Sequence, residues 1–551
     1  MMRHGGKILS DQLVKLGVRR VFSVPGESFL AALDGLHDAD IQNVVCRHEG
    51  GAAMMAEAYG KMTGTPGVCF VTRGPGACNA SAGIHVAMQD STPMVLFVGQ
   101  IDNRQTDRET FQEVDYKAMF GGLAKWVAQV DTTERLPEYI ARAFRVAQSG
   151  RPGPVVLALP ENMLSGSADV GDFVGEIDCF PLASLENVEA MLRDLALAKK
   201  PLVVVGGSDW SDNAQEAVEE FAANLDLPVV TSFRRQDYCN NRHPNFVGDL
   251  NVGINPKLAA RVREADCLLL IGTRFGDIAT RGYTLVDPQN PNPMILHVHP
   301  DADALGQVYG TKMSLVATAT SFALNLPDAI KSITPQDGWS DWTAAARADY
   351  EAWITPQASP GACKQEQVIT WLSDNLPDNA ILTNGAGNYA AWLHRYFVYK
   401  QYGTQLAPTS GSMGYGFPAA ISASLEHPDR QVVCLAGDGC IQMTINEMST
   451  AIQHGAKPIV IVMNNGRYGT IRMHQEKTYP GRVSGTELAN PDYPALARAY
   501  GGFGALVARS EDFPAAFKAA QEAGTVAIIE CRIDLEALST GQTLTQVRAG
   551  A

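Results

Sequence analysis

The segment from Gly437 to Asn465 constrains the fold of this chain more than any other stretch, because it reads GDGCIQMTINEMSTAIQHGAKPIVIVMNN. An apolar run, QVVCLA, ends in Gly437-Asp438-Gly439, and a second run, PIVIVM, ends in Asn464-Asn465 after a helix-like stretch. This order predicts a strand, a helix and a second strand. Because such crossovers are right-handed, the acid and the amide are expected at the same edge of a parallel sheet.

The residue types at this edge suit a diphosphate bound with a hard cation. One carboxylate and one amide oxygen can share Mg²⁺, and glycine backbone at a helix N-terminus receives phosphate. A Gly-Asp-Gly sequence on its own is a common turn, because glycine tolerates positive φ and aspartate bonds its own backbone. The interval from Asp438 to Asn465 favours the metal site, since it accommodates one crossover helix and a return strand.

The chain has 551 residues, which is too long for a single core. Apolar runs alternate with helical patterns in three stretches, 1–165, 190–330 and 360–540, and this predicts an α/β protein of three doubly wound parallel-sheet domains. We expect Ser165–Glu189 and the polar stretch Ser332–Tyr350 to connect them. The predicted strands lie in RRVFSVPG, NVVCRHE, GVCFVT, MVLFVGQ, PVVLALP, KKPLVVVGGSDW, LPVVTSF, DCLLLIGTRFGD, ILHVHPD, NAILTNGAGNYAAW, QVVCLA, PIVIVM and VAIIECRID.

Charge and cysteine usage restrict the partners and the compartment. The net charge of −15 and the pI near 5.2 argue against nucleic acid or an anionic membrane surface as a partner. The ten cysteines include no CxxC pair, and Cys267 and Cys434 lie in apolar runs, which predicts buried free thiols. The N-terminal residues are too polar for a signal peptide, and no apolar run is long enough to span a bilayer. We expect a cytoplasmic protein.

The GDG…NN spacing resembles the metal motif of the thiamine-diphosphate (ThDP) enzymes. By this resemblance the three domains would bind the pyrimidine (1–165), lie centrally (190–330) and bind the diphosphate (360–540). The resemblance also implies Mg²⁺ ligands and cofactor contacts. The implied metal ligands are Asp438, Asn465 and the carbonyl of Arg467, and the implied cofactor contacts in this motif are Gly437, Asp438, Gly439, Cys440 and Asn465.

Two further segments resemble cofactor-binding parts of these enzymes. In APTSGSMGYGFPAAISA, from Ala407, Met413 would pack beneath the cofactor, and the carbonyl of Gly411 would accept a bond from its 4′-amino group. In CRHEGGAAMMAEAYGKMTG, Glu49 would bind N1′ of the aminopyrimidine and promote loss of the thiazolium C2 proton. That role requires a carboxyl group with a raised pKa in a mostly apolar pocket. Alternatively, Glu49 caps the helix that starts near Gly50.

Over nearly its whole length the chain resembles acetolactate synthase large subunits, with benzaldehyde lyase and pyruvate decarboxylase more distant. FQEVD and AKW resemble segments that line the substrate pocket, which implies that Phe111 and Lys125 line it and that Gln112 faces the reacting carbon. The loop with Glu27 and Ser28 would lie above the thiazolium. Glu27 is either a proton donor or relay, or an exposed turn residue.

The departures from the synthase pattern concern the substrate. The synthases carry an arginine that binds the carboxylate of a second keto acid, and Ile278 stands at that place, with Arg281 as an alternative. His474 stands where they carry a tryptophan that selects the acceptor. The histidine pair of pyruvate decarboxylases is also missing, because the corresponding stretch reads Glu109-Thr110. Acetolactate synthesis from two keto acids is therefore in doubt.

The resulting hypothesis is a ThDP- and Mg²⁺-dependent carboligase that decarboxylates a 2-oxo acid and transfers the cofactor-bound enamine to an aldehyde or a second 2-oxo acid. A non-oxidative decarboxylase, a benzaldehyde-lyase-like hydroxyketone lyase and a catalytically silent homologue are the alternatives. The resemblance implies a homodimer or homotetramer with sites built by two chains. Glycine turns in VVVGGSDWS and IGTRFGD leave FAD open as a further ligand.

Overall fold

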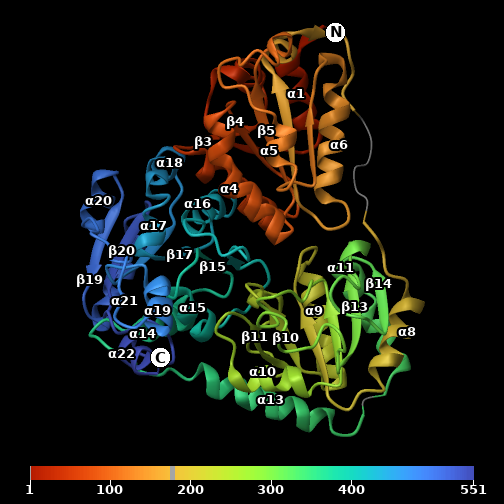
Figure 1. Cartoon of the computed structure of the whole chain (residues 1–551), viewed down its shortest axis with the longest axis vertical. Coiled ribbons are helices and arrows are strands. Elements are labelled where there is room, and N and C mark those ends of the chain that lie inside the picture. Colours follow the sequence, from red (N-terminus) through yellow and green to blue (C-terminus); the bar gives the residue numbers. More distant parts are fainter. Residues whose placement is uncertain (1, 174–179, 335, 551) are drawn as a thin grey trace.

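The computed structural model describes residues 2–173, 180–334 and 336–550. They form three domains, each built on a six-stranded parallel sheet with helices on both faces (Figure 1). This confirms the predicted α/β class. Cys267 and Cys434 are buried free thiols, as expected. Among the described residues, no helix combines the length and the apolar character needed to cross a membrane.

The N-terminal sheet has the strand order β3-β2-β4-β5-β7-β6. Its strands are β2 (Arg20–Ser23), β3 (Gln42–Val45), β4 (Gly67–Val71), β5 (Met94–Gln100), β6 (Trp126–Gln129) and β7 (Pro154–Pro160). The helices are α1 (Gly5–Lys15), α2 (Leu30–His37), α3 (Glu49–Thr63), α4 (Pro75–Asp90), α5 (Tyr116–Phe120), α6 (Leu136–Gln148) and α7 (Glu161–Ser165). A short antiparallel ribbon joins β1 (Arg3–His4) to β8 (Ser167–Ala168).

The central sheet has the order β11-β10-β9-β12-β13-β14. Its strands are β9 (Pro201–Val205), β10 (Val229–Ser232), β11 (Phe246–Leu250), β12 (Cys267–Ile271), β13 (Met294–His299) and β14 (Met313–Val316). The helices are α8 (Leu185–Leu195), α9 (Asp212–Leu225), α10 (Pro256–Glu264), α11 (Ala319–Ala323), α12 (Leu326–Ala329) and α13 (Trp339–Ile354).

The C-terminal sheet has the order β16-β15-β17-β18-β20-β19. Its strands are β15 (Ile381–Asn384), β16 (Gln405–Leu406), β17 (Val432–Gly437), β18 (Ile459–Asn464), β19 (Phe503–Val507) and β20 (Ala527–Arg532). The helices are α14 (Gln365–Asn375), α15 (Tyr389–Tyr396), α16 (Gly416–Glu426), α17 (Asp438–Ile441), α18 (Met448–His454), α19 (Gly469–Thr478), α20 (Tyr493–Ala499), α21 (Phe513–Glu522) and α22 (Leu544–Ala549).

The GDG…NN segment folds as its pattern predicts. Strands β17 and β18 are parallel neighbours, and Gly437 pairs with Met463 at their carboxyl ends. The crossover helix is broken into α17, a 3₁₀ turn at Ile445–Glu447 and α18. The acid and the amide therefore reach the same sheet edge, although the connection is less regular than a single helix.

The connector predicted at Ser332–Tyr350 is largely helical, because α13 occupies Trp339–Ile354. Trp339, Ala346 and Tyr350 recur at helical spacing and are buried. This apolar stripe explains why a polar stretch folds onto the central domain, along the lower edge of Figure 1. The other predicted connector, Ser165–Glu189, includes residues 174–179, which lie outside the described residues, and α8 begins within it.

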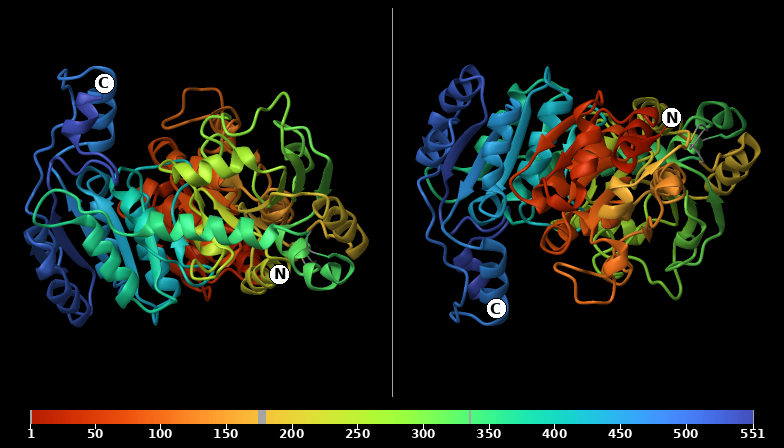
Figure 2. Two further views of the ribbon diagram at one scale, coloured as in Figure 1. Left: turned by 90° about the horizontal axis from the view of Figure 1, so that it is seen from below. Right: turned by 90° about the horizontal axis from the view of Figure 1, so that it is seen from above.

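The N- and C-terminal domains share a continuous apolar core. Helix α3 packs against α4 on one side and α16 on the other, and a single buried cluster extends from Ala52 and Ala80 to Phe417. The buried Ser422 hydroxyl donates to the Met55 carbonyl at 2.9 Å across this contact. The C-terminal end of the chain projects from the body of the molecule in both views of Figure 2.

Candidate active site

One cavity lies at the carboxyl edge of the C-terminal sheet, beside the first turns of α15 and α19. All residues of this domain that were predicted to hold the cofactor or the metal line it: Gly411, Met413, Gly437, Asp438, Gly439, Cys440, Asn465 and Arg467. The fold thus brings together three segments that lie apart in the sequence.

The Asp438 carboxylate is held by residues outside the GDG motif. The Asn490 side-chain amide donates to Asp438 Oδ2 at 2.7 Å and to Asn464 Oδ1 at 3.0 Å. The Tyr493 hydroxyl donates to the Asp438 carbonyl at 3.0 Å. Burial raises the pKa of Asp438, and the bond from Asn490 opposes that rise. The orientation of this acid is therefore set by Asn490, just before α20, and by Tyr493, the first residue of α20.

The two asparagines at the end of β18 have different surroundings. Asn464 Nδ2 donates to Glu530 Oε1 at 2.9 Å, and its Oδ1 accepts from the Gly466 amide at 3.0 Å. Asn465 lines the cavity with Asp438. Successive side chains of a strand point to opposite sides, so a pair of asparagines divides into one structural residue and one that faces the cavity.

The residues at this edge fit a magnesium-bound diphosphate. A carboxylate, an amide oxygen and the Arg467 carbonyl are the hard ligands that Mg²⁺ prefers. A Cβ atom at Gly437 would lie 2.9 Å from the Tyr389 ring, and one at Gly439 would lie 2.5 Å from the Tyr468 ring, so this turn requires glycine. Within the described ranges, no three His, Cys, Asp or Glu side chains gather as a metal site, so a cation at this edge would need mixed oxygen ligands.

Cys440 joins the GDG turn to the segment that contains Gly411 and Met413. Its sulfur accepts from the Gly414 amide at 3.1 Å and from the Tyr389 hydroxyl at 3.3 Å. The Thr444 hydroxyl donates to the Gly414 carbonyl at 2.8 Å. These contacts connect the side of the cavity predicted to hold the diphosphate, at the GDG turn, with the side predicted to hold the rings, at Gly411 and Met413.

Glu49 is the first residue of α3, but the helix cap comes from His48. His48 Nδ1 accepts from the Gly50 amide at 3.0 Å. Glu49 Oε2 accepts instead from the Asn79 side-chain amide of α4, at 2.9 Å. The Glu49 carboxylate is therefore directed toward α4.

The turn after β4 brings three predicted site residues together. The Ser28 hydroxyl lies 2.9 Å from the Thr72 hydroxyl. A Cβ atom at Gly76 would lie 3.3 Å from Glu49 Oε1, and one at Gly74 would lie 3.0 Å from the Gln112 Cβ atom. Ser28, Glu49 and Gln112 thus surround one loop of the N-terminal domain.

The chain therefore presents two groups of site residues on different domains. Among the described residues, those lining the cavity around Asp438 do not include Ser28, Glu49 or Gln112.

The other predicted substrate-pocket residues are dispersed in this single chain. Glu27 and His474 are exposed, and Phe111 is 76% exposed. Gln112 adopts a left-handed backbone with φ of 64° in the same loop as Phe111, a conformation seldom used by such residues outside functional or strained loops. Ile278 lines a different cavity, which also contains Arg274.

Lys125 contacts the end of a helix. Its amine donates to the Val146 and Ser149 carbonyls at 2.5 and 2.6 Å, and these groups end α6. Burial lowers the pKa of Lys125 to about 8. The structure thus shows a helix-capping contact for this residue, and its role toward the substrate stays a prediction.

The sequence pattern did not reveal several residues at the cavity. Tyr389, Ile471 and Leu538 line it, and Asn490 supports Asp438 from behind. Ile471 was within reach of sequence reasoning, because it follows the NN motif at the start of α19. The others occur in stretches without a motif.

Three family models match successive parts of the chain. They describe a thiamine pyrophosphate enzyme's N-terminal TPP binding domain (residues 3–119), its central domain (188–326) and its C-terminal TPP binding domain (385–531). Thiamine pyrophosphate is another name for ThDP. Each match overlaps one of the three sheets, and the two TPP-binding matches contain Glu49 and Asp438, respectively.

Similar proteins match almost end to end. The acetolactate synthase isozyme 2 large subunit of Escherichia coli is 30% identical over 93% of this chain and 92% of its own length. The acetolactate synthase large subunit of Haemophilus influenzae is 30% identical over 92% of this chain and 90% of its own. The mitochondrial acetolactate synthase catalytic subunit of Saccharomyces cerevisiae is 28% identical over 96% of this chain and 80% of its own length. This chain therefore belongs to the thiamine-diphosphate enzymes, in the family of the acetolactate synthase large subunits.

Proposed function

We propose that the protein is a ThDP- and Mg²⁺-dependent carboligase that decarboxylates a 2-oxo acid and joins the remaining acyl unit to an acceptor carbonyl compound. The observation that carries this proposal is the single cavity shared by Gly411, Met413, the GDG turn, Asn465 and Arg467. Family membership supports the same chemistry. We assign the pyrimidine to 1–165 and the diphosphate to 360–540, with 190–330 between them.

The residues of the C-terminal domain bind and orient the cofactor in this proposal. Asp438, the Asn465 amide oxygen and the Arg467 carbonyl would hold Mg²⁺ together with diphosphate oxygens. Met413 would support the rings, and the Gly411 carbonyl would accept the 4′-amino hydrogen bond. Bound ThDP supplies an electron sink for decarboxylation, whereas the protein supplies orientation and protons.

The residues of the N-terminal domain move protons and stabilise charge. Glu49 would hold a proton at N1′ of the aminopyrimidine, with its second oxygen oriented by Asn79. The Gln112 amide would donate to an alkoxide that develops on the substrate, because an amide donates without titrating. Glu27 would serve as a proton relay at the mouth of the site. Since Glu49 and Asp438 belong to separate groups in one chain, we propose a homodimer or homotetramer whose sites are completed by a second chain.

The residues proposed to select the acceptor favour an aldehyde over a second 2-oxo acid. Ile278 cannot pair with a carboxylate, and a lost pair of that kind costs several kcal/mol, roughly 3–5. The cavity wall near Asp438 includes the apolar side chains of Ile471, Ile533 and Leu538. An acceptor without a second charge suits these surroundings.

The test is a product survey with purified protein, ThDP, Mg²⁺ and a panel of 2-oxo acids, each with and without aldehydes. We expect carbon dioxide release and a hydroxyketone that appears only when the aldehyde is present. Free aldehyde as the sole product would replace carboligation by simple decarboxylation. Turnover of a hydroxyketone without any 2-oxo acid would indicate a lyase, and absence of turnover with every donor would indicate a silent homologue.

The same product survey also tests whether the acceptor is an aldehyde or a second keto acid. Acetolactate from pyruvate alone at ordinary rates would show that Ile278 and His474 do not prevent use of a second keto acid. The absorbance spectrum of the same preparation tests FAD, which the two glycine turns beside Gly207 and Gly272 leave open; these turns border the cavity that contains Ile278.

A further inference from the structure

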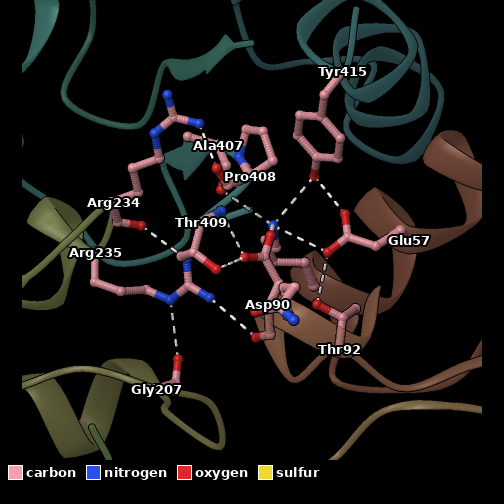
Figure 3. Close-up of polar contacts among 12 residues, drawn as sticks. Glu57, Asp90, Thr92, Gly207, Arg234, Arg235, Ala407, Pro408, Thr409 and Tyr415 are labelled. Atoms are coloured by element: carbon pink, nitrogen blue, oxygen red, sulfur yellow. Dashed lines mark hydrogen bonds and ion pairs between the residues drawn. The ribbon is translucent and has the colours of Figure 1, made fainter. Parts of the chain in front are cut away.

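A cluster of buried polar residues joins the three domains just before Gly411 (Figure 3). We call it the Asp90 cluster. It comprises Glu57, Lys61, Asp90, Arg234, Arg235, Thr409 and Tyr415. Glu57 and Lys61 belong to α3 and Asp90 ends α4, whereas the two arginines follow β10 and Thr409 follows β16.

Lys61 is the central cation of the cluster. Its ammonium donates to Asp90 Oδ2 at 2.5 Å and contacts Glu57 Oε1 at 3.0 Å. It also donates to the Ala407 carbonyl and the Tyr415 hydroxyl, both at 3.3 Å. The same hydroxyl donates to Glu57 Oε2 at 2.5 Å. One lysine thus bonds two carboxylates of its own domain and the backbone of the C-terminal domain.

Asp90 binds the next segment of that backbone. Its Oδ1 accepts from the Thr409 amide at 2.6 Å and from the Thr409 hydroxyl. The carboxylate is fully buried, and burial alone raises a carboxyl pKa, but the charges of Lys61 and Arg235 outweigh this effect and lower the pKa of Asp90. Asp90 therefore stays ionised and remains a hydrogen-bond acceptor for Thr409.

Arg234 binds the residue between Ala407 and Thr409. Its guanidinium donates to the Pro408 carbonyl and, at 2.9 Å, to the Gly385 carbonyl. Its backbone is left-handed, with φ of 58°, which is costly for a residue with a side chain. The neighbouring Arg235 reaches the N-terminal domain instead, donating to the Asp90 carbonyl at 3.2 Å.

Three consecutive residues are therefore held by charged side chains from the two other domains. Ala407 is bound by Lys61, Pro408 by Arg234 and Thr409 by Asp90. The Gly411 amide donates back to the Pro408 carbonyl at 3.0 Å, and Gly411 is left-handed with φ of 68°. The position of the Gly411 carbonyl thus depends directly on where the cluster holds Pro408 and Thr409.

We propose that Lys61, Asp90 and Arg234 are positioning residues for the reaction, because they fix the backbone that presents Gly411 and Met413 to the aminopyrimidine of the cofactor. This inference rests on the proposed ThDP function. It assigns a role in catalysis to three residues that do not line the cavity around Asp438 and are not among the predicted site residues of the N-terminal domain.

Stability alone does not explain buried charges at this junction. Apolar replacements of buried ion pairs are often neutral or stabilising, whereas charged hydrogen bonds impose one geometry. A misplacement of about 1 Å can slow an enzyme roughly 100-fold. The charged hydrogen bonds of the cluster therefore serve to hold the backbone from Ala407 to Thr409, and with it Gly411, in one position relative to the cofactor.

The experiment compares Asp90→Asn, Thr409→Val and Thr409→Ser in the full-length enzyme with saturating ThDP and Mg²⁺. The matched control is Glu426→Gln, which removes ion pairs to Arg19 and Arg20 between the same two domains, away from Gly411. The readouts are the exchange rate of the cofactor C2 proton, the ThDP dissociation constant, kcat and the thermal midpoint.

We expect Asp90→Asn and Thr409→Val to slow C2 exchange about tenfold or more. Thr409→Ser, which keeps the hydroxyl, should restore the rate to within about threefold, and Glu426→Gln should leave it unchanged at a similar thermal midpoint. Exchange within twofold of wild type in a folded Thr409→Val enzyme that binds ThDP overturns the positioning role, even if Asp90→Asn does not fold. Failure of the wild type to bind ThDP overturns the proposed function itself.

Discussion

Asn490 donates one side-chain hydrogen bond to Asp438 Oδ2, at 2.7 Å, and another to Asn464, and so connects the ends of β17 and β18 behind the cavity. Groups that orient a metal ligand typically contribute 10- to 100-fold to metal affinity. We predict that Asn490→Ala raises the Mg²⁺ concentration for half-maximal ThDP binding about tenfold or more. Titration of the apoenzyme with Mg²⁺ at fixed ThDP measures this.

A matched control for this prediction is Asn375→Ala, which removes an exposed asparagine that bonds the Trp371 carbonyl in the same domain. Its Mg²⁺ requirement should equal that of the wild type. Asp438→Ala is the stronger perturbation and should prevent cofactor retention even at high Mg²⁺. Normal ThDP binding by Asp438→Ala would refute the metal site altogether.

Glu49 contacts Asn79 rather than capping its own helix, which leaves the carboxyl group for chemistry. We predict that Glu49→Gln abolishes C2 proton exchange, by at least about 100-fold, because a glutamine cannot share a proton with a ring nitrogen. ThDP affinity should change only modestly. Proton exchange followed by NMR, alongside a binding titration, separates the two effects.

The appropriate comparison is Glu138→Gln, which changes an exposed glutamate of the same domain that pairs with Arg135. It should exchange the C2 proton at the wild-type rate. Wild-type turnover by Glu49→Gln would remove this residue from the proposed mechanism.

Lys125 ends α6 by donating to two carbonyls, so its replacement should lower stability. We predict that Lys125→Met destabilises the N-terminal domain by roughly 1–3 kcal/mol, the usual effect of losing hydrogen bonds to a charged group. The folded pKa of about 8 lies below the ordinary 10.5, so the unfolded chain binds more protons between these values. Wild-type stability should therefore rise relative to the variant between pH 8 and 10.5.

Thermal midpoints measured across this pH range test the prediction, with Lys15→Met, an exposed lysine at the end of α1, as the control. The KM for the 2-oxo acid decides the second role of Lys125. A KM change of tenfold with little loss of stability would place the amine at the substrate instead of the helix.

The sheets and the shared edge that carries Asp438 and Asn465 followed from sequence because their signals are local. Asp438 and Asn465 each end an apolar run, and the right-handed crossover determines where those ends meet. In the three six-stranded sheets, the strands without a prediction all lie at sheet edges: β6, β11, β14, β16 and β19. Edge strands such as β14 and β19 are half-exposed, and their short stretches, MSLV and FGALV, include a serine or a glycine that weakens the strand signal.

The Asp90 cluster and Asn490 could not be predicted in this way. Asp90 and Thr409 are separated by 319 positions, and their contact depends on how three domains pack. Lys61 lies in the last turn of α3 and Asp90 ends α4. A charged residue at a helix end looks, in sequence, like a solvated residue. Lys125 is the reverse case: the family resemblance predicts a pocket residue, whereas its amine bonds the two carbonyls that end α6, a contact without a signal in the sequence.

Glu476 in α19 holds the C-terminal helix against the cavity wall. It accepts from Arg548 of α22 at 2.8 and 2.9 Å and from Arg472 at 2.9 Å, and the bonds from Arg548 are the main cause that lowers its pKa to about 2. We predict that Glu476→Gln reduces hydrogen-exchange protection in α22 about tenfold at pH 7. This corresponds to about 1.4 kcal/mol, close to the lower end of the range for hydrogen bonds to charged groups, roughly 1.5–3 kcal/mol.

The pH dependence of this effect has a definite sign. Because the folded pKa lies below the ordinary 4.5, the stabilisation is fully present above pH 4.5 and is lost as the pH falls toward 2. The difference in protection between wild type and Glu476→Gln should therefore shrink between pH 4.5 and 2, whereas Glu522→Gln, an exposed glutamate of α21, should show no difference at any pH. A protection difference that persists unchanged at pH 3 would show that the ion pair with Arg548 does not hold the helix.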